Sequence, residues 1–317
     1  MRTEIITSAQ NPKIKNLLLL QEKSKARREQ GLFVVEGRRE LEHCLRSGFQ
    51  VRTVFVCPEI AGTEALLFQE ASAPYFADGN SNPSVQADSS GDLYASGTNP
   101  LDGMEALGFQ EASAPYFADG NPSASMPLLI EIPETLYRKV AYRESTEGII
   151  AEVEYKELGL NDLQLPANPL IVVLESVEKP GNLGAVLRSA DAAGADAVVF
   201  CDPLTDLYNP NLIRASIGAV FTVPTVRAST QELIPWLQER GIQILTAQLQ
   251  DSSLYYDVDM RRGTALVMGT ESTGLTQEWR KAASAHIRIP MLGRLDSLNV
   301  SVSTAILLYE AVRQRQA

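Results

Sequence analysis

The sequence predicts an α/β protein in which a small α/β unit precedes a larger one built on a parallel sheet. Apolar, strand-like runs alternate with helical patterns along the chain, which is typical of this fold class. The runs beyond about residue 169 are continuously apolar, as expected of strands buried on both faces of a parallel sheet. A chain of 317 residues, 44% apolar and 21% charged, is long enough for two globular domains.

The first unit is predicted to span residues 1–156. We expect its helices at 8–30, 38–48 and about 133–140, and its strands at 33–37, 51–58, 128–132 and 147–154. The helix at 38–48 is supported by Leu41, Cys44 and Leu45, which share one face, and by Gly48, which ends it. The stretch 157–168 is predicted to be a linker.

The second unit is predicted to span residues 169–317. Helical patterns follow most of its apolar runs, which predicts helices on both faces of the sheet. The predicted strands lie at 170–174, 197–201, 220–224, 242–247, 265–268 and 286–290. The predicted helices lie at 182–193, 209–217, 230–240, 275–284 and 298–314.

The net charge of −11 is unevenly distributed. Residues 1–60 carry a net charge of +4, residues 61–128 of −9 and residues 129–317 of −6. The basic segment is therefore a candidate nucleic-acid-binding surface, because a cluster of cations can neutralise several phosphates. A solvated helix face is an equally good interpretation. The candidate residues are Lys13, Lys15, Lys23, Lys25, Arg27 and Arg28.

An internal repeat carries most of the acidity. Residues 62–80 recur as 103–121, with differences only at Thr63/Met104 and Leu67/Gly108. Two copies are too few for a stacked solenoid. We interpret the tract as a duplication that interrupts the first unit with an acidic loop at about 70–125. Its negative charge should repel nucleic acid.

Several classes of protein are disfavoured by composition. Three widely spaced cysteines and two histidines favour neither a disulfide framework nor a metal site, so no metal is expected. No run of 18 apolar residues is present, so no membrane span is expected. The N-terminal sequence lacks an apolar signal core, which predicts a cytoplasmic protein. A nucleotide-dependent oxidoreductase would need the G-x-G-x-x-G turn, which is absent.

Three segments carry candidate chemistry. In 175–194 a strand leads through Pro180–Gly181 into a helix for which Asn182 is a suitable N-cap. In 266–276 a buried strand enters a glycine-containing loop, at the strand end where open α/β sheets bind ligands. In 289–315 a Pro- and Gly-shaped loop precedes a helix that Ser297 or Asn299 can cap. Each segment alone is also compatible with an ordinary structural role.

Together, and in this order, the segments resemble the SpoU/TrmH family of RNA ribose methyltransferases. The matching patterns are N-x-x-x-x-x-R, G-x-E-x-x-G-L and IPM-x-G-x-x-x-SLNVSV-x-x-A, over about 150 residues. More weakly, the first 60 residues and 128–154 resemble the ribosomal-protein-like, substrate-binding domain that often precedes this catalytic domain. The acidic repeat departs from the family pattern.

The resemblance implies a SPOUT-like catalytic domain with a deep trefoil knot, a homodimer, and S-adenosylmethionine as methyl donor to a ribose 2′-hydroxyl. The two-domain layout favours ribosomal RNA over tRNA as the substrate; a tRNA enzyme and a non-catalytic RNA-binding relative are the alternatives. The implied cofactor contacts are Gly269, Ile289, Met291 and Leu298. The implied active-site residues are Asn182, Arg188, Glu271, Ser297 and Asn299.

The resemblance also implies that Arg188 acts as a general base, which raises an energetic difficulty. Deprotonating an ordinary arginine at pH 7 costs roughly 7 kcal/mol or more. Either RNA and the second subunit perturb Arg188 strongly, or it stabilises the developing alkoxide and a phosphate electrostatically. We expect the second role to contribute at least as much as the first.

Overall fold

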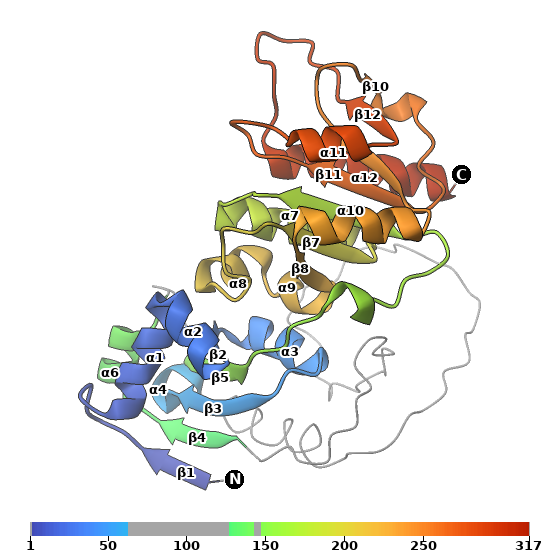
Figure 1. Ribbon diagram of the computed structural model, residues 1–317. Coiled ribbons are helices and arrows are strands. Elements are labelled where there is room, and N and C mark those ends of the chain that lie inside the picture. The colour runs from blue at the N-terminus through green and yellow to red at the C-terminus, as the bar shows by residue number, and fades with distance from the viewer. Residues whose placement is uncertain (1, 63–126, 143–146, 317) are drawn as a thin grey trace, which may run out of the picture.

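The computed structural model describes residues 2–62, 127–142 and 147–316, which form two sheets flanked by helices (Figure 1). The predicted acidic loop and most of the repeat lie outside the described residues. The structure therefore does not test that interpretation.

The first sheet has the strand order β1-β4-β3-β5-β2, with β1 at Arg2–Ile5, β2 at Leu32–Glu36, β3 at Val51–Val56, β4 at Leu128–Glu131 and β5 at Ile149–Glu154. Strand β4 runs parallel to β1 and β3, whereas β5 is antiparallel to β2 and β3. The helices are α1 (Pro12–Glu22), α2 (Ser24–Gln30), α3 (Arg38–Arg46), α4 (Pro58–Ala61) and α6 (Glu134–Val140).

The N-terminal helix differs from the prediction. One helix was expected over 8–30, but α1 begins after Asn11, whose side chain accepts a hydrogen bond from the Lys13 amide. Extended backbone at Lys23 then separates α1 from α2. The strand β1 was not predicted, because four residues at the chain end show no diagnostic periodicity.

The second sheet is entirely parallel, as predicted, with the order β10-β12-β9-β11-β6-β7-β8. Its strands are β6 (Leu170–Glu175), β7 (Ala197–Cys201), β8 (Thr225–Ala228), β9 (Gln243–Ala247), β10 (Ser253–Leu254), β11 (Thr264–Met268) and β12 (Ala285–Arg288). Its helices are α7 (Pro180–Ala192), α8 (Pro210–Ser216), α9 (Ala219–Thr222), α10 (Thr230–Glu239), α11 (Gln277–Ala282) and α12 (Val300–Gln316), with short 3-10 turns at η1 (Leu160–Asp162) and η2 (Tyr255–Asp257).

The strand predicted at 220–224 is wrong. The left-handed backbone of Gly218 opens the short helix α9, and the strand β8 begins only at Thr225. The side chains of Val220 and Phe221 are buried in either conformation, and a short apolar run does not distinguish a strand from a buried helix.

The predicted linker packs against the second sheet. Leu158 forms an isolated parallel bridge with Val226 of β8. Leu160, Leu163 and Leu165 contact the apolar cluster on one face of that sheet. These contacts restrict the motion of the connection between the two sheets.

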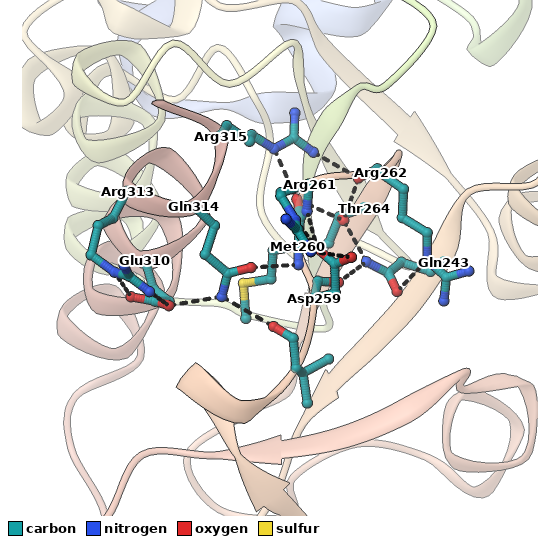
Figure 2. Close-up of polar contacts among 11 residues, drawn as sticks. Gln243, Asp259, Met260, Arg261, Arg262, Thr264, Glu310, Arg313, Gln314 and Arg315 are labelled. Carbon is teal, nitrogen blue, oxygen red and sulfur yellow. Dashed lines mark hydrogen bonds and ion pairs between the residues drawn. The ribbon is translucent and has the colours of Figure 1, made fainter. Parts of the chain in front are cut away.

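Hydrogen bonds join the C-terminal end of α12 to the segments that precede β6 and β11 in the second sheet (Figure 2). Arg315 donates hydrogen bonds to the main-chain carbonyls of Pro169, Met260 and Arg262. The Gln314 side chain accepts from the Met260 amide at 2.8 Å. Helix α12 begins near the carboxyl ends of the same strands. These contacts therefore fix the second end of the helix on the sheet.

A buried ion pair joins the two sheets. Arg27 of α2 donates from Nε to a carboxylate oxygen of Asp206, 2.8 Å away, and the two side chains are 2% and 6% exposed. The Tyr155 hydroxyl also donates to Asp206 at 3.1 Å. Burial, and then the Asp206 carboxylate, raise the pKa of Tyr155, so its hydroxyl remains a donor at neutral pH.

The Arg27 contacts correct one prediction. Arg27 was expected to contact RNA, but its guanidinium also donates to the carbonyl oxygens of Leu20 and Gln21 and is enclosed by protein. An aromatic cluster begins beside the pair at Tyr155 and Tyr208, which both contact Asp206 and pack against each other. Phe33 stacks on Tyr208 with ring centroids 4.2 Å apart. Arg27 therefore holds the two sheets together.

We expect Arg27→Met to lower the free energy of unfolding by about 3–5 kcal/mol, because it leaves the Asp206 carboxylate buried without its cation. Chemical denaturation measures the change. The adjacent, exposed Arg28 supplies the control: Arg28→Met should change stability by less than about 0.5 kcal/mol. Arg27→Met combined with Asp206→Leu should recover much of the loss. Equal stability of the two single variants would contradict the assignment.

Candidate active site

The three predicted segments meet at the carboxyl ends of β6 and β11. The loop after β6 leads into α7, the loop after β11 contains Glu271, and the segment after β12 leads into α12. Strands β6 and β11 are neighbours in the sheet. Parallel pairing places their carboxyl ends together, which is where open α/β sheets bind ligands.

Helix α7 begins earlier than predicted. Pro180 occupies its first turn, with Lys179 at the N-cap position, so Asn182 lies inside the helix. The prediction that Asn182 caps this helix is therefore wrong, because proline is well suited to the first helical positions. The Asn182 side chain is left available for contacts with other segments.

Asn182, Glu271 and Asn299 form a closed hydrogen-bonded triangle. The Asn182 side-chain amide donates to Glu271 Oε1 at 3.1 Å, and the Asn299 amide donates to the same oxygen at 3.0 Å. Asn299 also donates to Asn182 Oδ1 at 3.1 Å. The three residues come from three different segments, so this triangle joins the predicted motifs into one site.

Lys179 is a site residue that the motif reasoning missed. Its ammonium nitrogen lies 3.2 Å from Glu271 Oε2. The hydrogen bond from Lys179 is the main reason that the pKa of Glu271 is lowered from its ordinary value, so Glu271 is a carboxylate at neutral pH. The only sequence signal was a basic residue immediately before the Pro-Gly turn.

Asn299 also caps α12. Its side-chain oxygen accepts from the Ser301 amide at 3.0 Å, and its carbonyl accepts from the Ser303 amide at 2.9 Å. The structure thus selects Asn299 over Ser297 as the cap. The exposed Ser297 contacts Asp296 at 3.4 Å and does not join the triangle.

Arg188 lies on α7 one turn after Gly184, so both residues lie on the same face of the helix. A β-carbon at Gly184 would come within 2.5 Å of Ala215 in α8, so the two helices pack closely there. Arg188 itself is exposed and has no carboxylate partner among the described residues. Its guanidinium is therefore available to an anionic ligand.

Gly269 permits a close approach in the loop that holds Glu271. A β-carbon at Gly269 would lie 2.4 Å from the carbonyl carbon of Gly274, which is closer than nonbonded atoms can come. The Gly274 amide closes the loop by donating to the Thr270 carbonyl at 3.0 Å. Gly269 thus shapes the loop, whether or not its backbone also contacts a ligand.

The remaining predicted cofactor residues follow β12. Ile289 is partly buried against the core, whereas Leu298 is 38% exposed. Residues 291–298, which include Met291, belong to no helix or strand and make no main-chain hydrogen bond within the described residues. Such a segment offers free backbone donors and acceptors beside apolar side chains, which suits a ligand with a polar chain and an aromatic base.

The predicted basic cluster divides into exposed and occupied residues. Lys15, Lys23, Lys25 and Arg28 are exposed, and Lys13 is partly exposed beside Glu4. Lys23 and Lys25 have distant carboxylate neighbours at 3.9 and 3.7 Å, which are weak contacts at an exposed surface. Only Arg27 is removed from the candidate RNA-binding surface.

The site thus combines a carboxylate–amide triangle at the carboxyl ends of β6 and β11 with an exposed arginine on α7 that has no carboxylate partner among the described residues. Residues 169–309 match the profile of the SpoU rRNA Methylase family, and residues 11–77 match that of the MRM3-like substrate binding domain. The described helices include none long and apolar enough to cross a membrane.

Known proteins of the same family resemble this chain in sequence and in structure. The chain is 39% identical over 183 residues to a 23S rRNA (guanosine-2′-O-)-methyltransferase from Vibrio vulnificus, covering 56% of this chain and 74% of that protein. It is similar to the crystal structure of an RNA 2′-O ribose methyltransferase, with 34% identity, a TM-score of 0.70 and coverage of 99% and 100% of the two chains. An S-adenosylmethionine-bound rRNA methyltransferase from Sinorhizobium meliloti shares 26% identity, a TM-score of 0.76 and 98% coverage of both chains. The chain belongs to the SpoU rRNA methylase family.

We expect Gly269→Ala to lower the free energy of unfolding by about 1–3 kcal/mol, because the added methyl group overlaps the Gly274 carbonyl. Thermal or chemical denaturation measures this. Gly293→Ala is the matched control, since a β-carbon there meets no atom within 4 Å. A Gly269→Ala protein as stable as the control would show that the loop relaxes freely.

The Glu271 carboxylate should remain ionised below the ordinary carboxyl pKa of 4.5. Because its folded-state pKa is lowered, the stabilisation that it contributes is complete above the ordinary value and is lost as the pH falls through the lowered one. Lys179→Met should raise the pKa of Glu271 toward the ordinary value, whereas Lys281→Met should not. Carboxyl-carbon NMR titration measures both; an unchanged pKa in Lys179→Met would contradict the role of Lys179.

Proposed function

We propose that this protein transfers a methyl group from S-adenosylmethionine to a ribose 2′-hydroxyl of ribosomal RNA. The observation that carries the proposal is the triangle of Asn182, Glu271 and Asn299, drawn from the three family motifs. Arg188, on the same helix as Asn182, is exposed and has no carboxylate partner among the described residues. The names of the relatives support ribosomal RNA, since the Vibrio vulnificus protein is a 23S rRNA methyltransferase.

When bound, S-adenosylmethionine supplies an electrophilic methyl group on a sulfonium. The protein must then hold the ribose in line with it, and positioning of this kind lowers a barrier substantially. We assign Ser297 to orienting the ribose, whereas Asn299, whose amide group donates to Asn182 and Glu271, positions the loops around it. Glu271 holds the loops of the site in place through Asn182 and Lys179.

Arg188 stabilises negative charge on the 2′-oxygen as its proton leaves for solvent water. A free guanidinium beside a developing alkoxide lowers its energy without accepting a proton. The same group can hold a neighbouring phosphate through paired N–H donors. The exposure of Arg188 and its lack of an internal carboxylate partner support this electrostatic role over that of a general base.

For the cofactor, we assign contacts to Gly269, Ile289, Met291 and Leu298. The free main chain of residues 291–298 would hold the polar groups of S-adenosylmethionine, and Ile289 and Leu298 would enclose its adenine. We further propose that the chain around β11, β12 and α12 forms the trefoil knot of the family. The return of α12 onto α7 and β11 supports this.

We propose a division of labour between residues 1–156 and 169–317. The first unit binds RNA through the exposed residues Lys15, Lys23, Lys25 and Arg28, and the second transfers the methyl group. The match of residues 11–77 to a substrate-binding domain supports this division. The cytoplasmic location stays a prediction.

A homodimer is proposed from the two apolar faces of α12. One face packs into the core through Thr304, Leu307, Leu308 and Ala311. The other presents Val302 and Tyr309, which are 47% and 51% exposed. Exposed apolar residues that line one helix face are typical of a protein–protein interface.

The function is tested by incubating the purified protein with S-adenosylmethionine and unmodified 23S rRNA, and mapping 2′-O-methyl riboses. We expect methylation at a defined nucleotide, and Arg188→Ala should lower the single-turnover rate by about 100-fold or more. Arg188→Lys keeps the charge but loses the planar guanidinium, and should retain part of the rate. A wild-type rate and RNA affinity in Arg188→Lys and Arg188→Ala would exclude a catalytic role for this residue.

The dimer is tested by sedimentation velocity. Tyr309→Glu places a charge on the exposed face of α12 and should shift the protein to monomers, because an unpaired charge is costly to bury. Tyr256→Glu, at another exposed tyrosine, is the control and should leave the mass unchanged. A monomeric wild-type protein would refute the proposal.

A further inference from the structure

An aromatic ring and a guanidinium face each other across the junction of the two sheets. Tyr142 follows α6 of the first sheet, and Arg214 lies on α8 beside the second. The Arg214 Cζ atom lies 5.9 Å from the centre of the Tyr142 ring, which is a cation–π distance. Both residues are exposed, and neither has been assigned a role in the site described above.

Tyr142 is held by its main chain and by its ring hydroxyl. The Tyr142 amide donates to the Glu36 carboxylate at 2.7 Å, and its hydroxyl donates to Asn211 Oδ1 at 3.1 Å. A ring held in this way loses little conformational freedom when a ligand stacks on it. Arg214 is exposed and has no carboxylate partner among the described residues.

The surface beside this pair is hollowed. Its lining includes Gln21 of α1, Val34 of β2, and Pro210 and Ile213 of α8, together with Glu36. The Glu36 carboxylate disfavours a phosphate inside the hollow. An aromatic ring, a guanidinium plane and apolar side chains are the groups that bind unpaired bases.

The hollow lies between the elements assigned to RNA binding and to catalysis. Gln21 belongs to α1, the helix that carries Lys13 and Lys15. Ala215, the residue after Arg214, packs against Gly184 of α7, the helix that carries Asn182 and Arg188. A strand of RNA that touches both groups of residues would pass over this junction.

We propose that Tyr142 and Arg214 form a subsite for an unpaired nucleobase of the substrate RNA, which stacks on the exposed side of the Tyr142 ring. The subsite would hold a nucleotide away from the one being methylated, so it would act on RNA affinity rather than on methyl transfer. This inference rests on the proposed function, because it takes RNA as the ligand.

The experiment measures binding of single-stranded 12-mer RNA and of a 23S rRNA transcript to the full chain, alongside S-adenosylmethionine affinity and thermal melting. Tyr142→Ala and Arg214→Ala should each weaken RNA binding and raise KM for the transcript about tenfold, because base–aromatic stacking has this magnitude. Tyr142→Phe keeps the ring and should stay within about twofold of the wild type. Tyr256→Ala, after β10 at the sheet edge opposite β8, is the matched control.

Different outcomes would overturn the nucleobase subsite and the proposed methyltransferase function. Wild-type RNA affinity and KM in Tyr142→Ala would overturn the subsite, as would an equal loss in Tyr142→Phe, which would show that only the Asn211 contact matters. A crosslink from a 5-iodouridine-substituted RNA to Tyr142 would support it. If the wild-type chain binds RNA but transfers no methyl group, the proposed function fails while the binding data still test the subsite.

Discussion

The buried ion pair of Arg27 and Asp206 helps to set the relative position of the two sheets, beside an apolar cluster to which both contribute. The carboxylate of the pair comes from the loop that leads into α8, and its cation from α2. A buried pair contributes less net stability than its short distance suggests, because both ions lose their hydration. The pair instead constrains geometry. The Arg27 guanidinium reaches Asp206 together with the carbonyl oxygens of Leu20 and Gln21 when α2 has this position on the second sheet.

This constraint reaches the active site through helix packing. The loop containing Asp206 leads into α8, and α8 lies against α7, where Gly184 allows the close approach. The exposed cations Lys25 and Arg28 flank Arg27 on α2. The buried ion pair therefore helps to set the position of the proposed RNA-binding surface relative to α7, the helix that carries Asn182 and Arg188.

The sequence predicted the parallel sheet, because continuous apolar runs have a direct structural cause, and it singled out the three segments that the structure brings into contact. It did not distinguish Arg27 from its neighbours, since burial of an arginine depends on a carboxylate 179 residues away. It placed Asn182 at a helix cap, because cap preference is local and Pro180 was an equally good start. The triangle with Glu271 and Asn299 depends on strand order, which no local pattern contains.

Asn299 serves two structures with one side chain. Its oxygen holds the first turn of α12, and its amide group holds Glu271 and Asn182. Fraying of that turn and loosening of the site are consequently a single event. Anything that stabilises the site should slow hydrogen exchange at the Ser301 and Ser303 amides, and a second subunit packed on α12 would steady the site from outside it.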